Sequence, residues 1–276
     1  MKTRLTLPLL CPSLAALAAE PSVPASGVRL TILGDNSAAR PDVKAVWGFS
    51  CLVEARGHTI LFDTGADPAA LKEHLAVLKL DPARIDAVVI SHIHRDHTRG
   101  APGLGALPGV RAYTPHTFAD GLKETAALRA AGLQIVPVTT ATPLFDGITI
   151  SEPLRFEKAD AMDDTWEQCL SIDTPEGLVV VVGCSHPGIL PMLEQVKQQT
   201  GRPLYLVIGG FHLMGHRPTE VRRVATAMQT LGVAHVSATH CTGTVASHIF
   251  RTVFGDRYVD AGVGTVISLP FVPRTP

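Results

Sequence analysis

Aromatic residues and net charge are both scarce in this sequence. Phe, Trp and Tyr make up 5% of the 276 residues, and 24 Lys and Arg side chains are balanced by 25 Asp and Glu. A formal net charge of -1 leaves no basic surplus for non-specific binding to nucleic acid, and there is no acidic tail. We therefore expect no nucleic-acid partner.

Long apolar runs without charge are also lacking downstream of the first residues, so the sequence predicts no transmembrane helix. Apolar residues nonetheless make up 46% of the chain, which excludes a disordered or fibrous protein. The 24 Gly and 21 Pro indicate many turns between short elements. A chain of this length and composition is expected to form one large globular domain or two small ones.

The first residues have the pattern of a secretory signal. Basic side chains precede an apolar stretch at 5–17, and small residues follow it. This stretch is too short to span a bilayer, and Pro8 and Pro12 disfavour the alternative of an ordinary N-terminal helix. We predict a signal peptide at 1–19, export to the periplasm, and a flexible lead-in at 20–27.

The cysteines show no CxxC pair and no spacing typical of a disulfide framework. Cys11 is a weak candidate for lipid attachment, because leucines rather than small residues precede it. We expect Cys51, Cys169, Cys184 and Cys241 to be buried small hydrophobic residues. Cys184 and Cys241 are exceptions in one respect, since each lies beside a candidate site histidine.

Apolar periodicity predicts alternating strands and helices along the rest of the chain. Strands outnumber helices and begin as hairpins, which indicates two sheets in contact with helices outside them. The predicted strands are 28–33, 49–54, 59–62, 87–90, 133–138, 148–150, 170–172, 178–182, 205–208, 235–238 and 265–269, and the predicted helices are 68–80, 117–131, 189–199, 219–231 and 245–254.

Four side chains that can bind a metal lie within six residues, directly after the apolar strand predicted at 87–90. They are His92, His94, Asp96 and His97. At a strand end the backbone is free to turn these side chains toward one point, and imidazole and carboxylate groups suit zinc or a similar ion. The alternatives are a solvated polar loop and a buried cluster without metal, and the second would be costly.

This motif resembles the HxHxDH signature of the metallo-β-lactamase superfamily, and other segments support the resemblance. Asp63-Thr64-Gly65 resembles the strand-end Asp-Thr-Gly of that superfamily, and the likeness extends from about Val28 to Leu269. Within the superfamily, the chain is similar to the dihydropterin-aminobenzene-phosphate-synthase-like proteins. The segments that carry this similarity are Asp35-Asn36, Gly183 to Ile189, Gly209 to Leu213 and His240 to Gly243. The resemblance implies an α/β fold over residues 28–276, a four-layer αββα sandwich with a metal site at one rim of the sheets.

The resemblance also implies roles for individual residues. His92 and His94 match ligands of the first metal site of the family. Asp96 and His97 match ligands of the second site, and His240 matches the late histidine that completes it. We therefore expect two divalent metal ions, zinc in the first instance, although manganese and iron suit these ligands equally well.

The segment after the strand at 178–182 departs from the superfamily pattern. Typical hydrolases have a bridging Asp there, whereas this chain has Gly183-Cys184-Ser185 followed by His186. His186 would project from the same rim as His92, so we predict that it is a ligand. The bridging group and the metal count stay open, because Cys184 is either a thiolate ligand or a packed thiol.

Two further residues are candidates for supporting roles. His212 follows a strand and two glycines that permit close approach of the backbone to a ligand, so we predict a substrate or proton-transfer group rather than a structural histidine. Asp63 is expected to hold the free ring nitrogen of a ligand histidine, its alternative being a turn-forming Asp.

Hydrolysis is the chemistry that these ligands favour, because two bound metal ions lower the pKa of water and polarise a carbonyl or phosphoryl oxygen. In this hypothesis Asp96 orients the water and His212 protonates the leaving group of a small ester, lactone or phosphoester. The alternatives are a condensation like that of the synthase relatives and a metal-binding module without turnover. The shape of the substrate pocket depends on loops at 34–47 and 152–167, so the sequence does not rank ester, lactone and phosphoester substrates.

Overall fold

The computed structural model describes residues 27–156 and 165–271. The predicted signal peptide at 1–19 and most of the predicted lead-in lie outside the described residues, as do 157–164 and 272–276. Over the described part of the chain, no helix combines the length and apolar character needed to cross a membrane.

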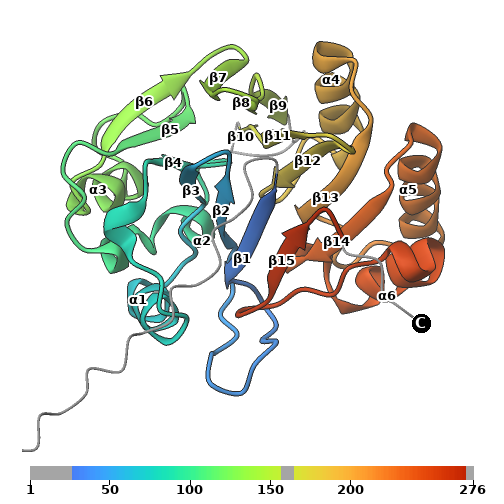
Figure 1. Cartoon of the computed structure of the whole chain (residues 1–276), viewed down its shortest axis with the longest axis horizontal. Coiled ribbons are helices and arrows are strands. Elements are labelled where there is room, and N and C mark those ends of the chain that lie inside the picture. Colours follow the sequence, from blue (N-terminus) through green and yellow to red (C-terminus); the bar gives the residue numbers. More distant parts are fainter. Residues whose placement is uncertain (1–26, 157–164, 272–276) are drawn as a thin grey trace, which may run out of the picture.

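Two β-sheets form the centre of the molecule, and helices cover their outer faces (Figure 1). The first sheet has the strand order β15-β1-β2-β3-β4-β5-β6 and the second has the order β14-β13-β12-β11-β8-β7. The strands of the first sheet are β1 Val28–Gly34, β2 Ser50–Ala55, β3 His58–Phe62, β4 Ala87–Val89, β5 Arg111–Pro115, β6 Gln134–Val138 and β15 Val266–Leu269. Those of the second are β7 Thr142–Phe145, β8 Ile148–Ile150, β11 Leu170–Thr174, β12 Gly177–Val182, β13 Leu204–Gly210 and β14 His235–Thr239.

The remaining elements are a two-stranded ribbon and the helices. β9 Leu154–Phe156 and β10 Thr165–Glu167 pair with each other. The α-helices are α1 Pro68–Val77, α2 Arg95–Thr98, α3 Lys123–Ala130, α4 Ile189–Thr200, α5 Pro218–Leu231 and α6 Thr244–Phe254, and short 3₁₀ helices occupy Pro82–Arg84, Ala101–Leu104, His240–Thr242 and Gly255–Arg257.

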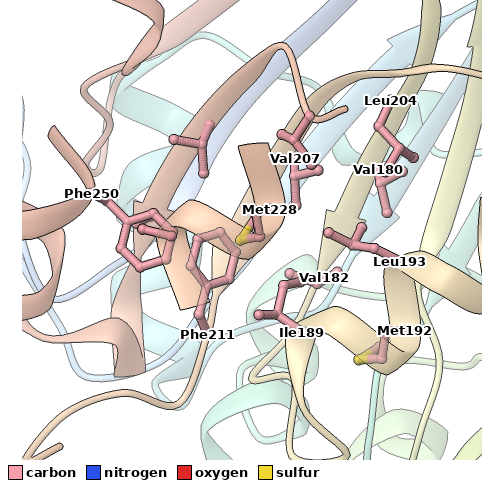
Figure 2. Close-up of a cluster of buried hydrophobic side chains, with 14 of the residues drawn as sticks. Val180, Val182, Ile189, Met192, Leu193, Leu204, Val207, Phe211, Met228 and Phe250 are labelled. Atoms are coloured by element: carbon pink, nitrogen blue, oxygen red, sulfur yellow. The ribbon is translucent and has the colours of Figure 1, made fainter. Parts of the chain in front are cut away.

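Three buried hydrophobic clusters separate four layers. One lies between the two sheets, one between the first sheet and α1 and α3, and one between the second sheet and α4, α5 and α6 (Figure 2). Strand β12 contributes to two of them, with Val179 and Val181 in the cluster between the sheets and Val180 and Val182 against the helices. A strand buried on both faces is apolar throughout, as this one is. The predicted αββα sandwich is therefore confirmed.

Several element boundaries differ from the prediction. The helix predicted at 117–131 begins only at Lys123, because Gly121 has a φ of 93° that an α-helix does not accept. The helix predicted at 68–80 ends at Val77, and Lys79 has a φ of 56°. The prediction lacks strands β5, β7, β9 and β10, which are only three to five residues long. These four segments show too little apolar alternation to be predicted from the sequence.

The candidate site residues follow strands that run in the same direction within each sheet. β3 is parallel to β4, and β12, β13 and β14 are mutually parallel neighbours. The carboxyl ends of these strands therefore meet at one rim of the sandwich. The residues that follow these ends are Asp63 after β3, His92 after β4, His186 after β12, His212 after β13 and His240 after β14.

Candidate metal centre

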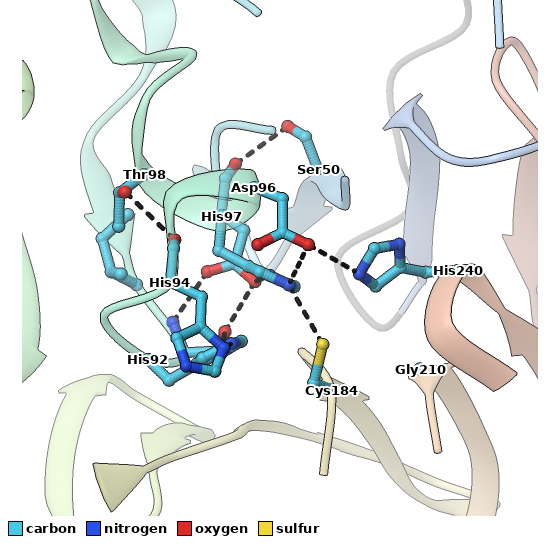
Figure 3. A network of polar contacts seen from close by, with 12 residues as sticks. Ser50, His92, His94, Asp96, His97, Thr98, Cys184, Gly210 and His240 are labelled. Carbon is cyan, nitrogen blue, oxygen red and sulfur yellow. Dashed lines mark hydrogen bonds and ion pairs between the residues drawn. The ribbon is translucent and has the colours of Figure 1, made fainter. Parts of the chain in front are cut away.

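The six predicted metal ligands meet at this rim in two groups of three. His92, His94 and His186 form one group and Asp96, His97 and His240 form the other, and the ligand atoms within each group lie within 4.8 Å of one another. We call these the first and second triads, and Figure 3 shows five of the six side chains converging. Within the first triad, His92 Nε2 lies 3.1 Å from His94 Nδ1.

Asp63 holds the second triad from behind. Its carboxylate is fully buried and accepts hydrogen bonds from Ser91 N, Ser91 Oγ and His97 Nδ1, each over 2.7 Å. Although burial opposes protonation of His97, Asp63 raises its pKa to about 9. The hydrogen bond to Asp63 keeps the Nδ1 proton in place and directs Nε2 at the cluster, so a metal that displaces the Nε2 proton would bind the tautomer that ligation requires. This is the supporting contact that the sequence analysis expected of Asp63.

Glu167 has the same function for the first triad, and the sequence analysis missed it. Its two oxygens accept backbone N–H groups of Cys184, Ser185 and His186 over 2.7 to 2.8 Å, and His186 Nδ1 lies 2.8 Å away. Burial raises the pKa of this carboxyl, but the hydrogen bonds outweigh burial and lower it to about 2. No local pattern marks Glu167, because it ends the short strand β10 and its partners lie 17 to 19 residues further along the chain.

The backbone around the cluster is strained. Of the six non-glycine residues with positive φ in the described chain, four lie at this rim: Asp63 at 56°, Ser185 at 64°, His212 at 50° and His240 at 47°. Such conformations cost about 1–3 kcal/mol each and concentrate at functional sites. The rim therefore holds these side chains in place at the expense of stability.

His240 carries the clearest sign that a cation belongs here. Its Nε2 is buried and has no hydrogen-bond partner, although it lies 3.4 Å from Asp96 Oδ2. Its other ring nitrogen, Nδ1, lies 3.1 Å from Asn36 Oδ1, and its backbone N–H donates to Asp35 Oδ1 over 2.7 Å. The ring is thus fixed with a free lone pair directed at the cluster. Five imidazoles and one carboxylate in this arrangement fit a divalent metal ion of borderline softness, and their burial would be costly without one.

Asp96 is the only carboxylate in the two triads, and Trp47 contacts it from outside. Trp47 Nε1 donates to Asp96 Oδ2 over 2.7 Å, and its ring packs edge-on against His240 at 5.0 Å. Burial raises the pKa of Asp96, but His240 and His97 hold it well below its usual range. Asp96 is therefore ionised at neutral pH. The sequence analysis did not single out Trp47, which lies in a loop and is half-exposed.

Two thiols and His212 form a third group beside the triads. The ligand atoms of Cys184, His212 and Cys241 lie within 4.8 Å of one another, and Cys184 Sγ is 3.2 Å from His97 Nε2. His212 is exposed, and its ring centroid lies 4.5 Å from that of His186. Hydrogen bonding to Cys241 raises the pKa of His212. All four cysteines of the described chain are buried and free, as predicted.

Two hollows open beside the cluster. One of about 280 Å³ is bordered by His186 and His212 and has a mainly apolar wall that includes Phe156, Ile189 and Phe211. The other, of about 340 Å³, lies against His240 and is lined by more polar side chains. A substrate group therefore has an apolar and a polar side of the cluster available to it.

Comparison with known proteins places these features in a family. The model of the metallo-β-lactamase superfamily matches residues 48–193. The 7,8-dihydropterin-6-methyl-4-(β-D-ribofuranosyl)-aminobenzene-5′-phosphate synthase of Methanocaldococcus jannaschii is 28% identical over 263 residues, which cover 80% of this chain and 89% of that protein. The crystal structure of Tm1679, a metal-dependent hydrolase of the β-lactamase superfamily, is 28% identical and covers 87% of this chain and 98% of its own, with a TM-score of 0.73.

Human tRNase Z, short form, has the same fold at 16% identity and a TM-score of 0.55, covering 88% of this chain and 100% of its own. At this identity the likeness concerns the fold alone. Because one protein of this fold is a tRNase Z, the expected absence of a nucleic-acid partner is not confirmed and stays a prediction.

Proposed function

Because the chain belongs to the metallo-β-lactamase superfamily, we propose that it is a hydrolase of a small ester, lactone or phosphoester that works with two divalent metal ions, zinc in the first instance. The observation that carries this proposal is the pair of adjacent triads, each supported by its own buried carboxylate. Metal ions held there would lower the pKa of water and polarise the oxygen of the bond that breaks.

Residues of the chain orient the water, donate a proton and bind the substrate. Asp96 is ionised and fixed by Trp47, so it accepts a hydrogen bond from the attacking water and orients it. His212 stands at the exposed edge of the cluster, and its raised pKa suits it to give a proton to the leaving group. The apolar hollow beside His212 receives the carbon skeleton of the substrate and keeps water from it.

The test is a panel of chromogenic esters, lactones, phosphomonoesters and phosphodiesters, assayed with the purified protein before chelation, after chelation, and after zinc or manganese is added back. Turnover should disappear on chelation and return with metal. His94→Ala should lose both bound metal and activity. His58→Ala is the matched control, because His58 begins β3 at the end away from the rim. An active, metal-loaded His94→Ala protein would overturn the proposal.

Condensation is the second candidate, because the relative from Methanocaldococcus jannaschii is named a synthase. The same preparations should be given a phosphorylated ribosyl compound together with a dihydropterin, with product formation followed by mass spectrometry. Condensation without hydrolysis would favour the synthase. Stoichiometric metal with neither reaction would favour a binding module.

We also propose that the protein is exported to the periplasm after removal of residues 1–19, because those positions have a basic, apolar and small-residue pattern. Cell fractionation and N-terminal sequencing of the mature protein test this. An intact Met1 in the cytoplasmic fraction would contradict it.

A further inference from the structure

The two triads are poor in negative charge. Five of their six ligands are imidazoles, which bind a metal as neutral groups, and Asp96 is the only carboxylate. Three other buried carboxylates lie nearby, and each has both oxygens engaged in hydrogen bonds. Asp35 accepts His240 N with one oxygen and Ser37 with the other. Asp63 uses both oxygens on Ser91 and His97, and Glu167 uses both of its oxygens on the backbone and ring behind His186.

One further side chain that becomes an anionic donor when a metal displaces its proton lies between the triads. Cys184 Sγ is 3.2 Å from His97 Nε2, and the ligand atoms of Cys184, His92 and His97 lie within 4.8 Å of one another. His92 belongs to the first triad and His97 to the second. The sulfur therefore lies within 4.8 Å of a ligand nitrogen of each triad, and Figure 3 shows its contact with His97.

We propose that Cys184 is a metal ligand whose thiolate bridges the two triads and supplies the charge that a bridging carboxylate would otherwise provide. This inference rests on the proposed function, since it concerns the same two ions. If a metal binds there, the S–H bond would break, the proton would pass to solvent, and a sulfur lone pair would form the bond to the metal.

The surroundings of Cys184 hold its sulfur in this place. The side chain is buried, and its backbone N–H donates to Glu167 Oε1 over 2.7 Å. The backbone at residue 183 can lie this close to Ser91 only because the residue is glycine, since a Cβ there would lie 2.1 Å from Ser91 Oγ. The sulfur is thus positioned before any metal arrives.

Cys241 provides a matched control for Cys184. It is equally buried and only one residue from His240, but its sulfur donates to the carbonyl oxygen of Cys184 over 3.6 Å. Among residues 27–156 and 165–271, its sulfur groups with Cys184 and His212 and not with either triad. Replacing Cys241 should therefore leave the metal centre intact, although it removes a thiol of the same kind.

The ligand type also makes a prediction about metal choice. Thiolate favours zinc, cobalt and iron, whereas carboxylate and water favour manganese and magnesium. The wild-type protein should prefer zinc over manganese. Cys184→Asp, which restores a carboxylate of similar size, should keep two ions and shift that preference toward manganese by about tenfold or more, in line with the effect of altered ligand surroundings on affinity.

The experiment is to load the full-length protein with cobalt(II) and record its absorption spectrum. Wild type and Cys241→Ser should show an intense sulfur-to-cobalt charge-transfer band in the near ultraviolet, and Cys184→Ser and Cys184→Asp should lack it. X-ray absorption of the zinc-loaded wild type should show a sulfur neighbour at about 2.3 Å beside nitrogen and oxygen neighbours. This second measurement needs no variant, so it tests the ligand even where a Cys184 variant does not fold.

The outcomes separate this inference from the function on which it rests. Two bound ions without a charge-transfer band or a sulfur neighbour would overturn the thiolate and leave the hydrolase proposal standing. Loss of the band in Cys241→Ser but not in Cys184→Ser would also overturn it. Failure of the protein to bind metal at all would overturn the proposed function, and the thiolate with it.

Discussion

Glu167→Gln removes the charge that organises the segment after β12, and its effect follows from the contacts of that carboxylate. In the native protein each oxygen accepts two hydrogen bonds, one pair from Cys184 N and Ser185 N and the other from His186 N and Nδ1. An amide nitrogen in place of one oxygen cannot accept these bonds. If the amide nitrogen of the substituted side chain faces His186, the Nδ1 atom of His186 must accept a hydrogen bond from it. The ring proton then moves to Nε2, and the lone pair that would bind the metal is lost.

The stability cost of this change follows from the pKa of Glu167. A lowering from the ordinary 4.5 to about 2, at about 1.4 kcal/mol per pKa unit, corresponds to about 3 kcal/mol. The sign follows because the pKa is lower in the folded state: the stabilisation is complete above pH 4.5 and is lost as the pH falls toward about 2. At pH 7 the metal-free Glu167→Gln protein should therefore be less stable than wild type by about 3 kcal/mol.

Urea unfolding of the metal-free proteins measures this difference, and chelator competition measures metal affinity. We expect Glu167→Gln to bind metal about 10–100-fold more weakly, as replacement of a partner behind a ligand histidine usually does. Glu54→Gln is the control, because Glu54 is also buried but pairs with Arg29 on β1 and β2, over 2.6 to 2.8 Å. It should lower stability without changing metal affinity. Unchanged metal affinity in Glu167→Gln would refute the reasoning.

Other substitutions test the packing and the edge of the site. Gly183→Ala places a Cβ 2.1 Å from Ser91 Oγ and should lower unfolding stability by about 1–3 kcal/mol, measured by thermal melting, and unchanged melting would contradict the close approach. Trp47→Phe removes the hydrogen bond to Asp96 and should reduce kcat/KM about fivefold, equivalent to about 1 kcal/mol, with the melting temperature unchanged because Trp47 is 50% exposed. Leu193→Ala, in the cluster between the second sheet and α4, should cost about 2–5 kcal/mol in urea and leave the metal content of the folded protein unchanged.

The parts of the site that the sequence predicted are those that lie next to strand ends. His92 and His94 follow an apolar strand at short, regular spacing, and His186 follows another, so strand position alone indicates that they share a rim. The side chains that support them could not be predicted in this way. Glu167 and Trp47 reach the ligands through the tertiary fold, from segments that look like ordinary polar or irregular chain.

In the fold, too, some features follow from the local sequence and others depend on the tertiary structure. Strands buried on both faces, such as β12, have an apolar run that predicts them directly. The helix predicted at 117–131 was too long. The apolar periodicity continues through Gly121, but the positive φ of that glycine is not helical, and the helix begins at Lys123. Hydrophobic pattern therefore predicts which segments are buried better than it predicts where they begin.

The metal site is also where the two sheets are joined. Asp63 holds His97 from the end of β3 in the first sheet, and Glu167 holds His186 after β12 in the second. Gln168, next to Glu167, donates its backbone N–H to Ser91 O over 2.9 Å and its side chain to Ile90 O over 2.9 Å, which ties the second half of the chain to the end of β4.

Each triad draws on different parts of the sequence: His186 joins the pair after β4, and His240 joins the pair at the start of α2. Neither triad is complete until the sheets have docked, so the unfolded chain has no equivalent binding site. A metal ion that binds both triads must then stabilise the docked arrangement by its own binding free energy. The positive-φ conformations at Asp63, Ser185, His212 and His240 oppose folding in the metal-free protein, and a bound metal would offset that cost.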